Sequence, residues 1–441
     1  MSTPIIFWFR NDLRLRDNPA WVQACATGQP IVALAFEPAM AAMEQRWGAE
    51  QPGAVRLQWW HANVQALQQE LSGQGVVLWI LRGAAPKVIP SLARRVGASA
   101  VYCSDIAAPY EQAELVALRG AGLEVHARWG CRLFDASSLP FAVEALPAVF
   151  SQFRNAVERA RVPVPPPLPA PSAARGFAVA PGDLPFFVEC LATPPAGESG
   201  LDPRSAFLWQ EGVASSVTAG NAGAHRYLDT YFASGRVAQY KATRNGLTGM
   251  DYSSKWSPWL AVGAVSAREI ILALRSYEDR HGQNDGSYWL WFELLWREYF
   301  RCLHQQYGGA LYRGRGLGDA SPPVKPEKHQ RAFAHWTQGR TGCELVDAGM
   351  RELAFSGYSS NRMRQILASF WIYDLGGDWR AGAAWFESQL LDYDVYSNQS
   401  NWLYIAGLGT DPRGGRRFNV PKQTAEHDPD GVYRALWSAA A

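Results

Sequence analysis

The sequence predicts an α/β N-terminal domain with a doubly wound parallel sheet, followed by an all-helical domain. Short β-rich runs alternate with helical patterns in the first part of the chain, a proline-rich segment follows, and the apolar periodicity from about residue 205 onward is helical. Because 441 residues suffice for two domains that share a large core, the chain is long enough to bury a deep site.

Five runs rich in β-branched and aromatic residues predict the strands of the sheet. They cover residues 4–10, 31–38, 76–81, 100–106 and 123–129. Helical patterns such as 55–71 and 109–122 separate them, and this alternation is typical of parallel strands joined by crossover helices. The first strand is followed by NDLRLRDNPA rather than by GxGxxG, which disfavours an ordinary dinucleotide site.

Residues 163–185 are rich in proline and sustain neither a helix nor a central strand. This segment marks the connection between the domains. We expect an α/β domain over residues 1–135, a linker over 136–204 and a helical domain over 205–441. Long apolar-periodic segments, of which 287–307 is an example, predict the helices of the second domain.

The composition excludes several classes of protein. The net charge is +2, so a nucleic-acid contact would need a local basic patch. The six cysteines form no CxxC pair and the eight histidines are dispersed, so neither a disulfide framework nor a metal site is expected. The start has no basic leader and only a short apolar run, which predicts a cytoplasmic protein without a membrane anchor.

Glu293 and Arg297 stand four residues apart on a predicted helix that is apolar on nearly every side. One interpretation is an ion pair within the helix. The other is contact with a ligand, because burying a charge without further hydrogen bonds is costly. The spacing alone leaves both open.

Three further segments carry polar groups. The stretch DYSSKWSPW at 251–259 offers hydroxyls and backbone N–H groups at a helix start, which either cap the helix or hold phosphate. Asn361 and Arg364 lie one turn apart at another helix start, either as capping and solvated groups or as ligand contacts. Asp392 and Asp394 have no histidine or further acid nearby, so they are poor candidates for metal ligands or for a glycosidase pair.

Four stretches together resemble the photolyase and cryptochrome family. They are WFRNDLRLRDNPA at 8–20, YKATRNG at 240–246, YSSKWSPWLAVG at 252–263, and the stretch 336–402 that ends in DYDVYSNQSNW. The resemblance spans nearly the whole chain. Within the family, LLDYDVYSN, AGLGTDPR and RRFNVPKQ are most like the DASH cryptochromes.

The resemblance implies a U-shaped FAD inside the helical domain. Arg364 would pair with Asp392 beside the isoalloxazine ring, and Asn398 would face flavin N5. A neutral amide there can donate or accept a hydrogen bond as the charge of the ring changes. The cofactor-binding residues that the resemblance implies are Tyr240, Ser253, Ser254, Lys255, Trp256, Ser257, Arg297, Arg364, Asp392, Asp394 and Asn398.

The resemblance also implies a deoxyribodipyrimidine photolyase, with light-driven electron donation from reduced FAD to a cyclobutane pyrimidine dimer in single-stranded DNA. Glu293 matches the acid that hydrogen-bonds the flipped dimer and stabilises its radical anion. Asn361 and Trp296 match other positions of the lesion pocket. Taking a dimer out of the stack costs less in a single strand than in a duplex. The resemblance implies that Arg244 and Arg362 contact the DNA backbone. We expect further contacts with DNA at Trp296, Tyr404, Arg413 and Arg417.

Trp402 and Trp379 match the two inner members of the family's photoreduction relay. Pro326 stands where the outer tryptophan is usual, so the third step is absent or is relocated to another surface aromatic residue.

Other departures from the family pattern lie near the expected flavin. Gln399 and Ser400 replace an aromatic residue and a glycine, and Ser359 replaces a methionine beside the lesion pocket. These changes favour an alternative function, a blue-light photoreceptor with little or no repair activity. The α/β domain of relatives often holds an antenna pigment, and Glu114 matches a contact of methenyltetrahydrofolate.

Overall fold

The computed structural model describes residues 3–40, 47–48, 51–179, 219–249, 251–319, 326–411 and 413–438. The second part of the expected linker, from residue 180 to 204, lies outside these residues, and so does the expected start of the helical domain, from 205 to 218. The side chain at position 326 is also outside the description, so the interpretation of Pro326 stays a prediction.

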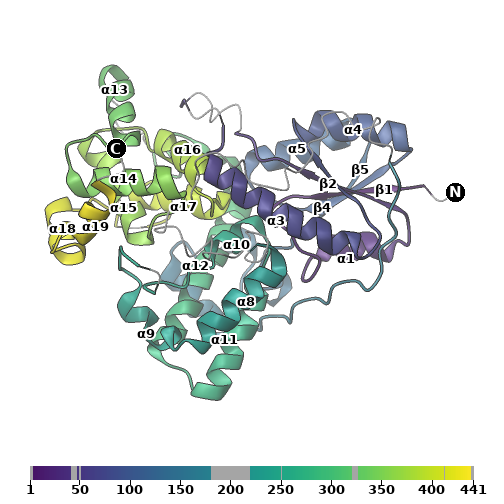
Figure 1. The fold of residues 1–441 in the computed structure, drawn as a ribbon, viewed down its shortest axis with the longest axis horizontal. Coiled ribbons are helices and arrows are strands. Elements are labelled where there is room, and N and C mark those ends of the chain that lie inside the picture. The colour runs from purple at the N-terminus through teal and green to yellow at the C-terminus, as the bar shows by residue number, and fades with distance from the viewer. Residues whose placement is uncertain are drawn as a thin grey trace.

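A five-stranded parallel sheet forms the N-terminal part of the fold, at the end of the molecule opposite to most of the helices (Figure 1). Its strands are β1 (Ile5–Phe9), β2 (Ile31–Phe36), β3 (Leu78–Leu81), β4 (Ala100–Ser104) and β5 (Glu124–Arg128). The order β3-β2-β1-β4-β5 reverses direction beside β1, as in a doubly wound sheet. All five expected strands are confirmed.

Alternate residues of the central strands face two separate cores. Phe7 and Phe9 belong to the larger core, which includes side chains of α1 (Pro19–Ala26) and α3 (Ala54–Ser72). Ile6 and Trp8 belong to the smaller one, which includes side chains of α4 (Ala85–Val96) and α5 (Pro109–Gly120). Because both faces are covered, these strands are continuous hydrophobic runs rather than alternating ones.

The second part of the fold is helical, as expected. Its α-helices are α8 (Gly220–Ala233), α9 (Arg236–Thr243), α10 (Ser257–Val262), α11 (Ala267–His281), α12 (Asp285–Tyr307), α13 (Pro326–Thr337), α14 (Glu344–Ser356), α15 (Asn361–Ser369), α16 (Trp379–Gln389), α17 (Val395–Ala406), α18 (Val420–His427) and α19 (Val432–Ser438). After α15 the chain continues as a π-helical turn over Phe370–Asp374. Among the described residues, no helix combines the length and the hydropathy that crossing a bilayer requires.

In its described part, residues 136–179, the segment expected to be a linker contains an α-helix. This is α6 (Phe150–Arg159), whose Phe150, Phe153 and Val157 are buried. Residues 163–175 form neither helix nor strand, as the prolines require. Gly176 then makes an isolated bridge with Ile31.

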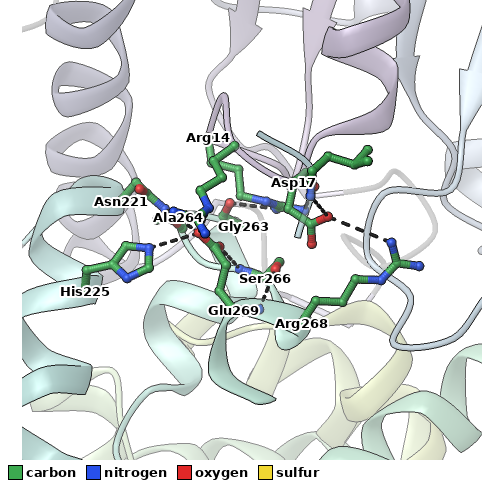
Figure 2. Close-up of polar contacts among 11 residues, drawn as sticks. Arg14, Asp17, Asn221, His225, Gly263, Ala264, Ser266, Arg268 and Glu269 are labelled. Atoms are coloured by element: carbon green, nitrogen blue, oxygen red, sulfur yellow. Dashed lines mark hydrogen bonds and ion pairs between the residues drawn. The ribbon is translucent and has the colours of Figure 1, made fainter. Parts of the chain in front are cut away.

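Arg14 joins the two domains through backbone carbonyls (Figure 2). Its Nη1 donates to Gly263 O, and its Nη2 donates to the carbonyl oxygens of Asp17 and Gly130, each at 2.8 Å. Gly263 has a φ of +75°, and a Cβ there would lie 2.2 Å from Asn11 O. Only glycine permits this approach of the helical domain to the loop after β1.

Glu269 is a second polar centre of this interface and is almost fully buried. It accepts hydrogen bonds from the backbone N–H of Ser266 and from His225 (Figure 2). Burial alone would raise the pKa of this carboxyl, but the bond with His225 and the charge of Arg14 outweigh it, and the pKa is lowered. The acid therefore stays charged inside the interface.

Candidate functional site

Arg364 and Asp392 form a partly buried ion pair between α15 and the turn before α17. Nη2 of Arg364 lies 2.9 Å from both carboxylate oxygens of Asp392, and the hydroxyl of Ser257 donates to Oδ2 at 2.7 Å. Ser360 caps α15 by accepting from Met363 N, which fixes the helix start that carries Arg364. The pair expected from the resemblance is confirmed, and the interpretation of Arg364 as a solvated group is wrong.

Asp394 is the N-cap of α17, where it accepts from the backbone N–H and the hydroxyl of Ser397. Its other oxygen accepts from Nη2 of Arg301 at 2.6 Å. Burial would raise the pKa of Asp394, but the charges of Arg301 and Arg297 outweigh it and lower the pKa to about 2. Asp394 is thus a fixed negative charge two residues beyond Asp392.

The loop before α10 brings polar groups toward the same region. Lys255 has a φ of +55°, which is left-handed for a non-glycine residue. Its ammonium lies 3.6 Å from the ring centroid of Tyr252, and burial lowers its pKa to about 7. Trp256 is buried against Tyr231, with centroids 5.3 Å apart, and Tyr240 is also buried. Since α10 has only six residues, the loop rather than a helix dipole would have to supply a phosphate site.

A cavity of about 70 Å³ lies between α15, α17 and the end of α16 with the turn that follows it. Arg364, Asp392, Asp394, Asn398 and Trp402 are among the residues that line it. The side-chain nitrogen of Asn398 donates to Ala383 O at 3.0 Å, which fixes the orientation of the amide. A guanidinium, two carboxylates and an amide around one cavity fit the polar edge of a flavin, which presents both carbonyl acceptors and an N–H donor.

Glu293 pairs with Arg244 at the end of α9 and not with Arg297. The guanidinium of Arg244 also covers the ring of Trp289, with its carbon 4.1 Å from the centroid. Arg297 instead donates to Cys131 O at 3.1 Å. The interpretation of Glu293 and Arg297 as an ion pair within the helix is therefore wrong, because partners from other segments compete for both side chains.

Trp296 and Tyr404 line a second, larger cavity of about 510 Å³. Their rings meet edge to face, with centroids 6.0 Å apart. Phe150 of α6 stacks on Trp296 at 3.7 Å, with the planes 11° apart. One face of Trp296 is therefore occupied by a residue of the connecting segment. Glu293 and Asn361 do not line this cavity, and Asn361 instead lines the cavity beside Asp392.

Three of the arginines expected to contact DNA, Arg244, Arg362 and Arg417, are linked through contacts of Arg362 with their sequence neighbours. Arg362 donates to Asn245, the neighbour of Arg244, at 3.1 Å, and its guanidinium lies over Phe418, the neighbour of Arg417. Arg417 pairs with Asp374 and Arg413 with Asp411, yet the arginine side chains are 66% and 71% exposed. Such pairs cost little to break, so both arginines remain available to phosphates.

Trp402 and Trp379 are both buried but lie in different surroundings. Trp402 lines the cavity beside Asp392, whereas Trp379 lines a cavity at the domain interface. Near them, Gln399 donates to Leu311 O at 2.7 Å. The hydroxyl of Ser400 is buried and makes no hydrogen bond within the part of the chain that the structure describes.

The interface cavity has a volume of about 530 Å³ and lies at the carboxyl ends of β1, β2 and β3. Glu114 lines it and accepts from Nη2 of Arg10 at 2.6 Å. Burial raises the pKa of Glu114, and the positive charge of Arg10 partly offsets this rise. Asn398 lines this cavity as well as the one beside Asp392, so the two spaces share a wall.

Comparisons with known proteins agree with this architecture. Residues 5–172 match the family model of DNA photolyase, and residues 289–440 match that of the FAD binding domain of DNA photolyase. The relatives named cryptochrome DASH from Synechocystis sp. and from Xenopus laevis are 38% and 40% identical. The alignments cover 98% and 99% of this chain, and 87% and 82% of the relatives.

Solved structures give the same result. A cryptochrome from Synechocystis sp. superposes with a TM-score of 0.85 at 36% identity, covering 99% of this chain and 89% of that one. A bacterial class III photolyase from Agrobacterium tumefaciens gives 0.76 at 27% identity, covering 99% and 86%. The chain belongs to the photolyase and cryptochrome family. The full-length relatives just described place it with the cryptochrome DASH proteins of that family.

Arg301 is a charged residue of the site that the sequence reasoning missed. It is 1% exposed and provides the main positive charge beside Asp394. Although burial opposes the effect, Asp394 raises the pKa of Arg301. The spacing in the sequence could have indicated its role, because Arg301 lies four residues after Arg297 and therefore on the same face of α12.

Proposed function

We propose that the chain is a blue-light-absorbing FAD flavoprotein that splits cyclobutane pyrimidine dimers in single-stranded DNA by light-driven electron transfer. The observation that carries this proposal is the Arg364–Asp392 pair, which lines one cavity together with Asn398 and Trp402. Bound FAD would supply the one-electron chemistry, and the protein would supply position and charge. Of the described residues, Arg364, Asp392, Asp394 and Asn398 would hold it.

The residues of α12 would act on the DNA side. When released from Arg244, the carboxyl of Glu293 would accept a hydrogen bond from a flipped base, or donate one if protonated. Burial raises the pKa of this carboxyl, and the positive charge of Arg244 partly offsets the rise. Trp296 and Tyr404 offer ring surfaces for stacking. Arg244, Arg362 and Arg417 would bind the phosphates.

The test is irradiation of a single-stranded oligonucleotide that carries one dimer, with purified protein and a reductant. We expect loss of the dimer that depends on blue light, and a smaller rate with the matched duplex. Glu293→Gln keeps the size of the side chain but removes its charge, and should lower the rate about tenfold. Dimers that persist under light with wild-type protein would contradict repair.

A photoreceptor without repair activity is the second candidate. Two observations favour it: Glu293 is already paired with Arg244, and Phe150 already covers one face of Trp296. Such a protein would change its surface when the flavin changes charge. Limited proteolysis in darkness and under blue light tests this, and identical cleavage patterns would reject it.

An antenna pigment such as methenyltetrahydrofolate would occupy the interface cavity that Glu114 lines. Mass spectrometry of the pigments released from purified protein tests for it. The cytoplasmic location expected from the sequence stays a prediction, and a relative from Oryza sativa carries the name cryptochrome DASH, chloroplastic/mitochondrial. Imaging of a fluorescent fusion checks the location.

A further inference from the structure

The side chain of Lys255 is buried in the protein rather than extended into solvent. Its ammonium lies 3.6 Å from the ring centroid of Tyr252 and 4.6 Å from that of Tyr358. An ammonium held against two aromatic faces is stabilised by the electron density of the rings. Since the backbone of Lys255 is left-handed, with a φ of +55° that is unfavourable for a non-glycine residue, the buried side chain is what keeps the turn in place.

Tyr358 brings Lys255 close to the ion pair of the candidate site. The guanidinium carbon of Arg364 lies 5.2 Å from the centroid of the same tyrosine ring. Two positive groups thus share one aromatic side chain, and each disfavours the charge of the other. Asp392 provides the countercharge of Arg364. Lys255 therefore needs an acid of its own.

Glu352 of α14 is that acid. Burial lowers the pKa of Lys255, and the charge of Glu352 is the largest of the charges that favour the ammonium. Burial also raises the pKa of Glu352 to about 7, although a hydrogen bond from Tyr433 and the charge of Lys255 both favour its ionised form. Because neither charge is stable alone in this interior, each depends on the other.

Tyr433 of α19 fixes the position of Glu352. Its hydroxyl donates to Oε2 of Glu352 at 2.5 Å, and both residues are buried. The backbone N–H of Tyr433 donates to Oδ1 of Asp428 at 2.8 Å, which anchors the start of α19. Lys255 is thus connected, through α14, to α19.

The loop that contains Lys255 has backbone donors available for a ligand. Among the described residues, no group accepts a hydrogen bond from the backbone N–H of Ser254 or from that of Trp256. Lys255 stands between these two residues. Neighbouring N–H groups beside a buried positive charge attract an anion. A ligand that carries phosphate groups therefore fits this loop, whereas a ligand without them gains nothing from it.

We propose that Glu352 and Tyr433 are positioning residues for the phosphates of FAD, because they hold Lys255 and Lys255 holds the loop over residues 253–257. This inference rests on the proposed function, which takes FAD as the ligand of the site. Without the charge of Glu352, the ammonium of Lys255 loses its proton or turns to solvent, since an unpaired buried charge is costly. The first change removes the positive charge of the loop, and the second releases its left-handed turn. Both weaken the binding of phosphates and leave the residues around the isoalloxazine ring in place.

The experiment titrates flavin-free, full-length protein with FAD and, separately, with riboflavin, which has no phosphate group. Flavin fluorescence gives the two dissociation constants. We expect Glu352→Gln to raise the dissociation constant of FAD about tenfold and that of riboflavin less than about twofold. Glu344→Gln is the matched control, because Glu344 also joins α14 to α19, through Arg434, but its side chain is 78% exposed. Equal effects of Glu352→Gln on both flavins, as a general loss of structure would cause, would overturn the proposal.

Lys255→Met, which keeps the length of the side chain and removes its charge, tests whether Glu352 acts through Lys255. We expect this variant to weaken FAD binding about tenfold. The double variant Lys255→Met/Glu352→Gln should bind FAD no more weakly, because residues that act as one unit do not have additive effects. Additive losses in the double variant would overturn the proposal.

Tyr433→Phe keeps the inference testable if the Glu352 variant folds poorly. This variant removes only the hydrogen bond to Glu352, so we expect a loss of FAD affinity of about threefold and no change for riboflavin. Affinity for FAD equal to that of the wild type would count against the role of Tyr433. Wild-type protein that binds neither flavin would refute the proposed function and this inference with it, whereas an unchanged ratio of the two constants in every variant refutes the inference alone.

Discussion

Arg301 and Asp394, 93 residues apart in the chain, form an ion pair of 2.6 Å inside the helical domain. The pair joins the middle of α12 to the first turn of α17. It also fixes the second acid of the site, whose pKa is lowered to about 2.

Asp394→Asn should lower the free energy of unfolding at pH 7 by about 2 kcal/mol. Since the folded-state pKa of Asp394 is depressed, its contribution is complete above the unfolded pKa and is lost as the pH falls toward about 2. The difference between wild type and variant should therefore shrink as the pH is lowered from about 5. Urea denaturation at several pH values measures it. The control is Asp251→Asn, because Asp251 pairs with Arg236 but its side chain is 79% exposed.

Asp392→Asn should reduce the flavin content of the purified protein. It leaves the Arg364 guanidinium without its countercharge at a site where the acid side chain is only 3% exposed, and breaking such a buried pair costs about 3 kcal/mol. The ratio of flavin to protein absorbance measures the effect. Asp374→Asn, which breaks an exposed pair with Arg417, should retain full flavin, and equal content in both variants would contradict a role of Asp392 in binding.

Arg244→Gln should raise the pKa of Glu293 further. Burial already raises this pKa, and Arg244 is the charge that opposes it. Without the arginine, the carboxyl stays protonated to a higher pH. Infrared difference spectra between Arg244→Gln and the double variant Arg244→Gln/Glu293→Gln would show the protonated carboxyl band and its titration. A band that titrates at the same pH with and without Arg244 would rule out this coupling.

Gly263→Ala should destabilise the protein by about 3 kcal/mol more than Gly235→Ala. The φ values are +75° and +74°, so both variants carry the same backbone cost. Only position 263 lies against another domain, whereas a Cβ at 235 meets nothing within 4 Å. Thermal denaturation of the two variants compares them. Equal melting temperatures would show that the close contact of Gly263 with the loop after β1 adds no stability.

The features that the sequence predicts best are the strands and helices, which local patterns determine. The strands follow from β-rich runs, and α12 from its apolar periodicity. The pairing of Arg364 with Asp392 came from the family resemblance. No spacing rule predicts that Glu293 turns to Arg244, because the partner lies 49 residues away on another helix. The stacking of Trp336 on Trp371 could not be predicted from the sequence either, because Trp371 stands in an apolar run that is typical of a buried core.

The absence of a side chain at Gly382 couples the packing of Trp371 to that of Trp402. Its Cα lies where the indoles of Trp371 and Trp402 converge, and the close packing of a protein core leaves no slack for an added methyl group. Alanine at 382 should therefore be tolerated only by homologues with a smaller residue at 371 or 402. Aligned family members would show these three positions varying as a unit, with total volume conserved.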